Sequence, residues 1–217
     1  MKRAFAICLL AAALPLPAQA QSLAKDPLTQ SVDRGLAFLA LLQEKDGAWV
    51  SAGVKHPAVT SLAVMAYLSA GHGPGEGPHR GTGEKGIRWV LEQQQSDGTF
   101  GAPGFDEMYR QGICTMMLCE VVAMSDAKTA ARMRPKLEQA VKVILAAQRM
   151  DSSLFQGGWR YQRHSTDADL SITGWQILAL RAARNIGCDV PAERIDRAME
   201  FVLRCRDARS GAFCYMP

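Results

Sequence analysis

Long hydrophobic runs and strong charge of one sign are both missing from most of this chain of 217 residues. After residue 14 no apolar stretch approaches the ~20 residues that a membrane-spanning helix needs, so we expect no transmembrane segment. The formal net charge is only +4, and no stretch interleaves basic and aromatic side chains. Nucleic acid is therefore not expected as a partner.

Histidine and cysteine are few, and their spacing does not suggest metal ligands. The four histidines are scattered, so we expect no metal site and no cofactor. Five cysteines follow residue 20, and an odd number leaves at least one thiol unpaired or joined to another chain. We expect most of them to be small buried side chains. They are Cys114, Cys119, Cys188, Cys205 and Cys214.

The first twenty residues have the parts of a secretory signal in order. Lys2 and Arg3 precede an apolar run over residues 4–14, and Ala18-Gln19-Ala20 supplies the small residues of a cleavage site. Cleavage after Ala20 would leave 197 residues with a formal charge of +2. We therefore expect an exported protein, periplasmic or extracellular, with residues 1–20 as its signal peptide.

One pattern occurs four times, with copies that begin at residues 34, 85, 139 and 197. Each copy starts with a basic or polar residue and a small one, continues with a largely apolar pair, and reaches a glycine-aromatic turn. The turns contain Gln43, Gly47 and Trp49; Gln94, Gly98 and Phe100; Gln148, Gly158 and Trp159; and Gly211 and Phe213. Repetition on this scale indicates one supersecondary unit that is copied and stacked.

Helical periodicity dominates every unit, and no segment shows a convincing period of two. Amphipathic helices are expected over residues 32–43, 84–95, 137–148 and 195–205, with more apolar helices over 59–70, 113–124 and 172–186. Residues 71–83 are expected to form a flexible loop. The chain is thus predicted to be all-α, with one domain over residues 21–217 whose tandem helix pairs form an open arc or a partial α/α toroid.

These copies resemble the repeat of the squalene cyclase and protein prenyltransferase superfamily, often called the QW motif. The resemblance covers residues 32–213 and implies an α/α toroid, in which the glutamine caps the following inner helix and the aromatic ring stacks on its amide. A closed ring of this family takes about six helix pairs, and the units here start near 32, 84, 137 and 195. The last unit is incomplete, so we expect either a missing C-terminal half or a surface that another subunit covers.

The resemblance also suggests where chemistry would be decided. Squalene-hopene-type cyclases protonate their substrate with an Asp-any-Asp-Asp cluster, and the nearest match here is Asp167 and Asp169, with Leu170 in the adjacent acidic position. A strong acid needs a neighbour that tunes it, and this cluster lacks one. The zinc-binding Asp-any-Cys pair of prenyltransferases and the thioester segment of complement-type domains are both absent from the sequence.

The best candidate site follows the third turn, where aromatic, basic and acidic side chains are concentrated. Trp159, Tyr161 and Trp175, with Tyr109 from the equivalent part of unit two, are expected to line an apolar ligand site. The competing interpretation is structural: Asp169 or Ser171 caps a helix, and Arg160 or Arg163 pairs with Asp167.

The sequence therefore favours binding of an isoprenoid-like or extended peptide ligand on the inner-helix surface. The alternatives are a terpenoid cyclase that uses Asp167 and Asp169, and a structural interaction module.

Overall fold

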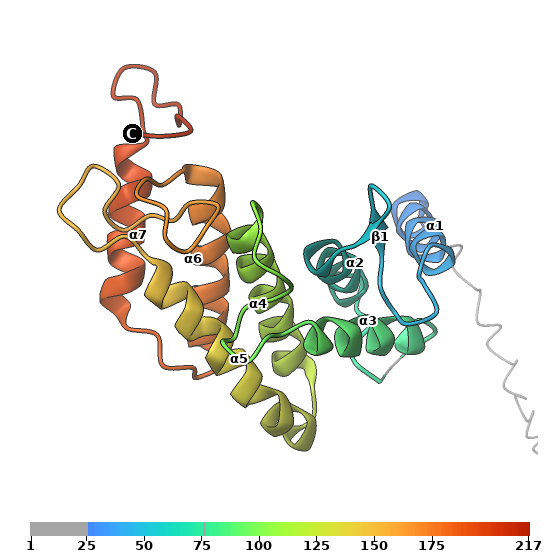
Figure 1. The fold of residues 1–217 in the computed structure, drawn as a ribbon. Helices are drawn as coiled ribbons and strands as arrows, with labels where there is room; N and C mark the ends of the chain where they lie inside the picture. Colours follow the sequence, from blue (N-terminus) through green and yellow to red (C-terminus); the bar gives the residue numbers. More distant parts are fainter. Residues whose placement is uncertain (1–25, 76) are drawn as a thin grey trace, which may run out of the picture.

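The computed structural model describes residues 26–75 and 77–217, so the expected signal sequence and its cleavage site lie outside the described residues. The described part contains seven α-helices and one short antiparallel hairpin, which confirms the all-α prediction (Figure 1). The helices are α1 (Pro27–Leu41), α2 (Pro57–Ser69), α3 (Arg80–Glu92), α4 (Glu107–Met124), α5 (Ala127–Ala147), α6 (Leu170–Asn185) and α7 (Ala192–Arg204); the strands are β1 (Val50–Ser51) and β2 (Val54–Lys55).

Helices α2, α4 and α6 form a central row, in which α4 packs against both of the others (Figure 1). Three of the other helices pack mainly on the central helix that precedes them in the chain, since α3 contacts α2, α5 contacts α4 and α7 contacts α6; α1 contacts α2, which follows it. The last amphipathic helix thus has a packing partner within the described residues. Ala198 and Phe201 of α7 are fully buried, because the helix pairs with the preceding central helix rather than with a following one.

Several helices begin earlier than periodicity predicts, because their first turns are polar. Helix α5 begins at Ala127 rather than residue 137: the Asp126 carboxylate accepts hydrogen bonds from two backbone amides and caps the helix, and Pro135 lies inside it. Helix α3 begins at Arg80, within the predicted loop 71–83. The hairpin was not expected, and its two-residue turn places Ala52 and Gly53 at positive φ.

The core runs through the central row, where side chains from three helices interdigitate. Met117 and Leu118 of α4, Tyr67 of α2 and Leu180 of α6 are all less than 2% exposed. Burial of such side chains contributes about 1.5 to 3 kcal/mol each. Within residues 26–75 and 77–217, none of the helices has the length and hydropathy of a membrane span.

The repeat turns pack against the helix that opens the next unit, which explains the regular spacing. Gly47, Gly98 and Gly157 all have positive φ, and a Cβ at these positions would strike the backbone of Lys85, Gln139 and Arg197 respectively. The three contacted residues are the first residues of the second, third and fourth copies of the pattern. Gly157 rather than Gly158 is therefore the third glycine of the series, because only Gly157 combines positive φ with this contact.

The glutamine of each of the first three copies joins its turn to the following amphipathic helix. The Gln43 side-chain amide donates to the carbonyls of Gly47 at 3.0 Å and Thr82 at 2.9 Å. The other two glutamines repeat this arrangement: Gln94 donates to Gly98 and Lys136, and Gln148 donates to Gly157 and Arg194. The expected capping of the next inner helix is thus corrected, since the amide donates to carbonyls of the next amphipathic helix.

Candidate functional site

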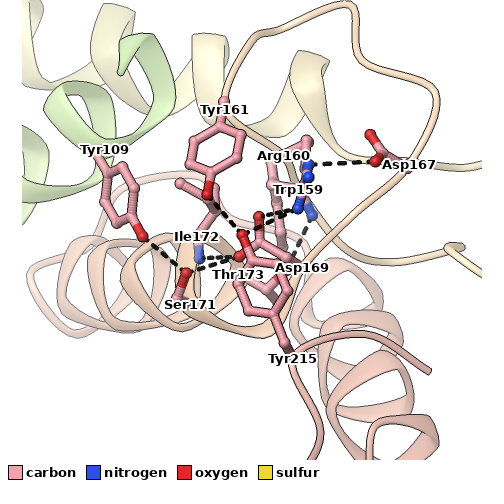
Figure 2. A network of polar contacts seen from close by, with 10 residues as sticks. All are labelled: Tyr109, Trp159, Arg160, Tyr161, Asp167, Asp169, Ser171, Ile172, Thr173 and Tyr215. Atoms are coloured by element: carbon pink, nitrogen blue, oxygen red, sulfur yellow. Dashed lines mark hydrogen bonds and ion pairs between the residues drawn. The ribbon is translucent and has the colours of Figure 1, made fainter. Parts of the chain in front are cut away.

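The predicted acidic pair lies at the N-terminal end of α6, within the polar network of Figure 2. Asp169 is fully buried and caps the helix, because its Oδ1 accepts hydrogen bonds from the Ile172 amide at 2.9 Å and the Ser171 hydroxyl at 2.8 Å. Its Oδ2 accepts a hydrogen bond from Arg160 Nη1 at 2.9 Å. Both oxygens of this carboxylate are therefore occupied as acceptors by groups of the protein.

Arg160 is the centre of the network. Its guanidinium pairs with Asp169 and, through Nε at 3.3 Å, with the half-buried Asp167. It also stacks over the ring of Tyr161 at 4.6 Å and lies 5.5 Å from the ring centre of Tyr215. The expected pairing of Arg160 with Asp167 is confirmed, and the structure adds the buried partner Asp169.

Aromatic side chains from three separate segments meet beside Arg160. The Tyr161 and Tyr215 hydroxyls lie 2.7 Å apart, the ring of Phe105 stacks on Tyr161 with centroids 4.4 Å apart, and the Tyr109 hydroxyl bonds Ser171 Oγ at 2.8 Å. We call Phe105, Tyr109, Tyr161 and Tyr215 the aromatic cluster. Phe105 is 72% exposed and Tyr215 is 47% exposed, so the cluster opens to solvent.

Two members of the aromatic cluster were predicted from the sequence, and the other two were not. Tyr109 and Tyr161 come together as expected, with ring centroids 5.9 Å apart. Phe105 lies two residues before the first residue of α4. Tyr215 lies beyond the fourth turn, in a segment that no local pattern connects to the third turn. Partial loss of hydration at its hydroxyl, followed by the hydrogen bond with Tyr161, raises the pKa of Tyr215 above its usual value, so this phenol stays neutral.

The two tryptophans of the predicted site have different surroundings. Trp159 is 1% exposed, its indole N–H donates to the Ile144 carbonyl at 2.8 Å, and its amide donates to Thr173 Oγ1 at 3.0 Å. Its ring is part of the core and offers a ligand no free surface. Trp175 is half-buried and follows Ser171 by one helical turn, so it continues the face of α6 that carries the cluster.

A second polar group lies at the start of α4, in the equivalent part of unit two. Asp106 accepts a hydrogen bond from Arg110 Nη1 at 2.8 Å, and its other oxygen lies 2.6 Å from His56 Nε2. His56 and Asp106 occupy the cap positions of α2 and α4, as Asp169 does in α6. These groups therefore mark the same end of all three central helices.

Arg163 connects the third turn region to unit two rather than pairing with Asp167. Its guanidinium lies 2.6 Å from the buried Glu107 and 2.9 Å from Asp97. The hydroxyl and amide of Thr99, followed by Arg163, hold the pKa of Asp97 at about 2. Asp97 is therefore ionised at all but strongly acidic pH.

A cavity of about 610 Å³ lies away from the predicted site, between α3, the end of α4 and the start of α5. Its floor is apolar, and charged side chains of both signs surround it. The floor contains Ile87, Leu91, Val121 and Met133; the rim contains Glu84, Arg88, Glu92, Arg132 and Lys136. None of the predicted ligand-binding side chains lines this cavity.

All five described cysteines are free, and four of them are buried. Burial raises the pKa of Cys114 to about 12 and raises that of Cys119 as well. This confirms the interpretation of most cysteines as small core side chains, with Cys214 as the exposed exception. Among residues 26–75 and 77–217, no three His, Cys, Asp or Glu side chains are grouped to hold a metal ion.

Comparison of the sequence with protein-family models and with curated proteins finds no match. The similarity to the squalene cyclase and prenyltransferase superfamily therefore stays a prediction from the repeat pattern, and the function has to be argued from the site itself.

Proposed function

We propose that this chain is an exported binding protein of the squalene cyclase and prenyltransferase repeat type. Its helix pairs would form an open arc or a partial α/α toroid, and the central helices would form the inner surface. On that surface the aromatic cluster and the adjoining face of α6 would bind an extended peptide through its apolar side chains. The observation that carries the proposal is the exposed but rigidly held aromatic cluster.

Single exposed apolar side chains are common on folded proteins, whereas a group of them is informative. Phe105 is 72% exposed and Leu178, two turns after Ser171 on α6, is 49% exposed. Leu178 and the half-buried Trp175 extend the apolar surface along α6. Contiguous apolar patches of this kind mark interaction sites, and aromatic anchors supply much of the binding energy at such sites.

The cluster is held in place before any ligand arrives. Hydrogen bonds fix the hydroxyls of Tyr109, Tyr161 and Tyr215, and stacking fixes the ring of Phe105. A surface that is already ordered loses little side-chain entropy on binding. This favours a binding role over a purely structural one, for which exposed rings would bring no benefit.

An extended peptide suits this surface better than an isoprenoid. Small apolar ligands are usually bound in clefts that cover most of their surface, whereas Phe105 and Tyr215 stand open to solvent. An extended peptide can lie across an open surface and place alternate side chains on it. The isoprenoid therefore remains the second candidate for the same residues.

A terpenoid cyclase activity receives little support from the two aspartates. A general acid has to reach the atom that it protonates. The Asp169 carboxylate is fully buried and bound to Arg160, Ser171 and Ile172. Asp167 pairs with Arg160 at the surface. This arrangement supports structural roles for both carboxylates.

Selection of binders from a library of unstructured peptides displayed on phage tests the proposal. We expect peptides rich in apolar and aromatic side chains, whose affinity falls at least about tenfold in Phe105→Ala and Tyr161→Ala, because each change removes buried contact area. Leu154→Ala is the matched control, since Leu154 is 55% exposed and lies outside the aromatic cluster.

Three results would contradict peptide binding. Equal loss of affinity in Leu154→Ala would show that the aromatic cluster has no special role. Turnover of squalene by the unaltered protein, lost in Asp169→Asn, would instead establish the cyclase alternative. Binding of a long-chain prenol that Phe105→Ala weakens, without any peptide binding, would favour the isoprenoid.

A further inference from the structure

The chain makes the same internal interface three times, each time between a repeat turn and the next amphipathic helix. The glutamine of each turn donates to one helix carbonyl, and the glycine of the turn packs against the backbone three residues further on. The carbonyls belong to Thr82, Lys136 and Arg194; the glycine contacts belong to Lys85, Gln139 and Arg197. The constant offset of three residues shows that all three interfaces share one register.

Both sides of this interface are buried wherever it forms. On the turn side, Trp49, Phe100 and Trp159 are at most 3% exposed. On the helix side, the equivalent residues are Trp89, Val143 and Phe201, and they are at most 7% exposed. A small residue follows each contact residue, as Gly86, Ala140 and Ala198. At Gly86 a Cβ would lie 3.0 Å from the ring of Trp49, so a larger side chain would displace the turn.

The fourth turn has the same form, but no helix among residues 26–75 and 77–217 packs against its glycine. Gly211 has positive φ, as in the other turns. Phe213 is 54% exposed, in contrast to its buried counterparts. A Cβ at Gly211 would meet only the Arg206 side chain. In the part of the chain that the structure describes, half of the repeated interface is therefore present here without a helix against it.

Helix α1 presents the other half. Its Arg34-Gly35 pair corresponds to Lys85-Gly86, yet a Cβ at Gly35 would meet nothing within 4 Å. Phe38 corresponds to the buried Trp89, and it is 59% exposed. Apolar side chains before and after this point are exposed as well, namely Leu28, Val32, Leu41 and Leu42.

We propose that two copies of this chain associate head to tail, with the fourth turn of one copy on α1 of the other. The register of the three internal interfaces places Gly211 against the backbone of Arg34 and Phe213 beside Gly35 and Phe38. The residue at the glutamine position is Arg206, whose guanidinium can donate to the Ser31 carbonyl, three residues before Arg34. Because the two surfaces differ, the interface is heterologous and can extend to further copies or close into a ring.

The second copy is favoured over other occupants because it carries the required features at the required spacing. Three helices of this chain receive a repeat turn, and α1 matches them in the small residue at position 35 and the large apolar residue at position 38. Phe38 on α1 and Phe213 in the fourth turn are exposed, and their counterparts in the three internal interfaces are buried.

Sedimentation velocity on residues 21–217, from about 1 μM to about 500 μM, tests the association over the range expected for a small interface. The wild-type apparent mass should rise from that of one chain to at least twofold. Gly35→Arg should keep the mass of one chain, because the new side chain blocks the docking position. Gly81→Arg is the matched control: Gly81 is also an exposed helical glycine with nothing within 4 Å, and this variant should associate like wild type.

Mixing two blocked variants tests the head-to-tail geometry. Phe213→Arg alone should also sediment as one chain. Mixed with Gly35→Arg it should form a pair of two chains, because one variant keeps an intact fourth turn and the other an intact α1. Circular dichroism confirms that the variants fold.

The exposed thiol of Cys214 lies beside Phe213 and offers a second measurement. As the protein concentration rises, the rate of thiol labelling should fall at least twofold in wild type and stay unchanged in Gly35→Arg.

Three results would overturn the proposal. A wild-type chain that stays single at the highest concentration has no such interface. Association that survives Gly35→Arg uses another surface. Blocked variants that fail to pair when mixed show that α1 and the fourth turn do not form one interface.

Discussion

Replacing Gly157 by alanine should destabilise the folded chain by about 2 to 5 kcal/mol. Two costs contribute. Gly157 has a φ of +86°, and the left-handed conformation costs a residue with a side chain about 1 to 2 kcal/mol. The new methyl would also come within 2.6 Å of the Arg197 carbonyl carbon and 3.2 Å of the Ala198 nitrogen. Because backbone cannot move aside as a side chain can, overpacking adds about 1 to 3 kcal/mol.

Gly53→Ala isolates the first cost. Gly53 has a φ of +80°, and a Cβ there would meet nothing within 4 Å, so only about 1 to 2 kcal/mol should be lost. Urea unfolding of residues 21–217, followed by far-ultraviolet circular dichroism, gives both values from the shift in midpoint at unchanged slope. Equal losses within about 0.5 kcal/mol would refute the argument that the turn packs on the backbone of α7.

Three further changes test other contacts. Gln148→Ala should cost about 1 to 3 kcal/mol in urea unfolding, because one turn carbonyl and one helix carbonyl lose their donor. Replacement of the exposed Gln95 by alanine, the control, should change stability by less than about 0.5 kcal/mol. Thr173→Val keeps the shape of the side chain but leaves a buried backbone N–H without its acceptor, so thermal unfolding should report a loss of about 1 to 3 kcal/mol. Hydrogen bonds from Thr99 lower the folded-state pKa of Asp97 from 3.8 to about 2. Its ionised form therefore stabilises the fold above pH about 4, and this contribution is lost as pH falls toward 2. In a pH series, the urea midpoint should drop less steeply for Asp97→Asn than for the wild type.

The start of α5 illustrates why local pattern locates a helix better than its ends. Apolar periodicity identified residues 137–148, because those side chains face the core. The first two turns of α5 are polar, and a proline such as Pro135 disfavours a helix interior. The helix nevertheless begins at Ala127, where the Asp126 carboxylate accepts two backbone amides. Capping and packing on α4 outweigh the cost of the proline.

The candidate site depended even more on the tertiary structure. Sequence proximity suggested that Trp159, Tyr161 and the two aspartates act together, but Trp159 turns into the core while Phe105 and Tyr215 join Tyr161 at the surface. Residues 161 and 215 are in contact only because the segment after α7 returns to the start of α6, where the Leu170 amide donates to the Tyr215 carbonyl at 2.9 Å. No periodicity within one unit encodes such a contact.

The sequence by itself determined the helical class and the repeated turns, because a 3.6-residue period and a glycine before an aromatic residue are local properties of the chain. It also marked the four positions 34, 85, 139 and 197. Only the tertiary structure decided what those positions are for: three of them receive the turn of the preceding unit, and position 34 receives none within the described residues. The physical reason is that a local pattern specifies which face is buried, whereas the partner of that face is fixed by packing between distant segments.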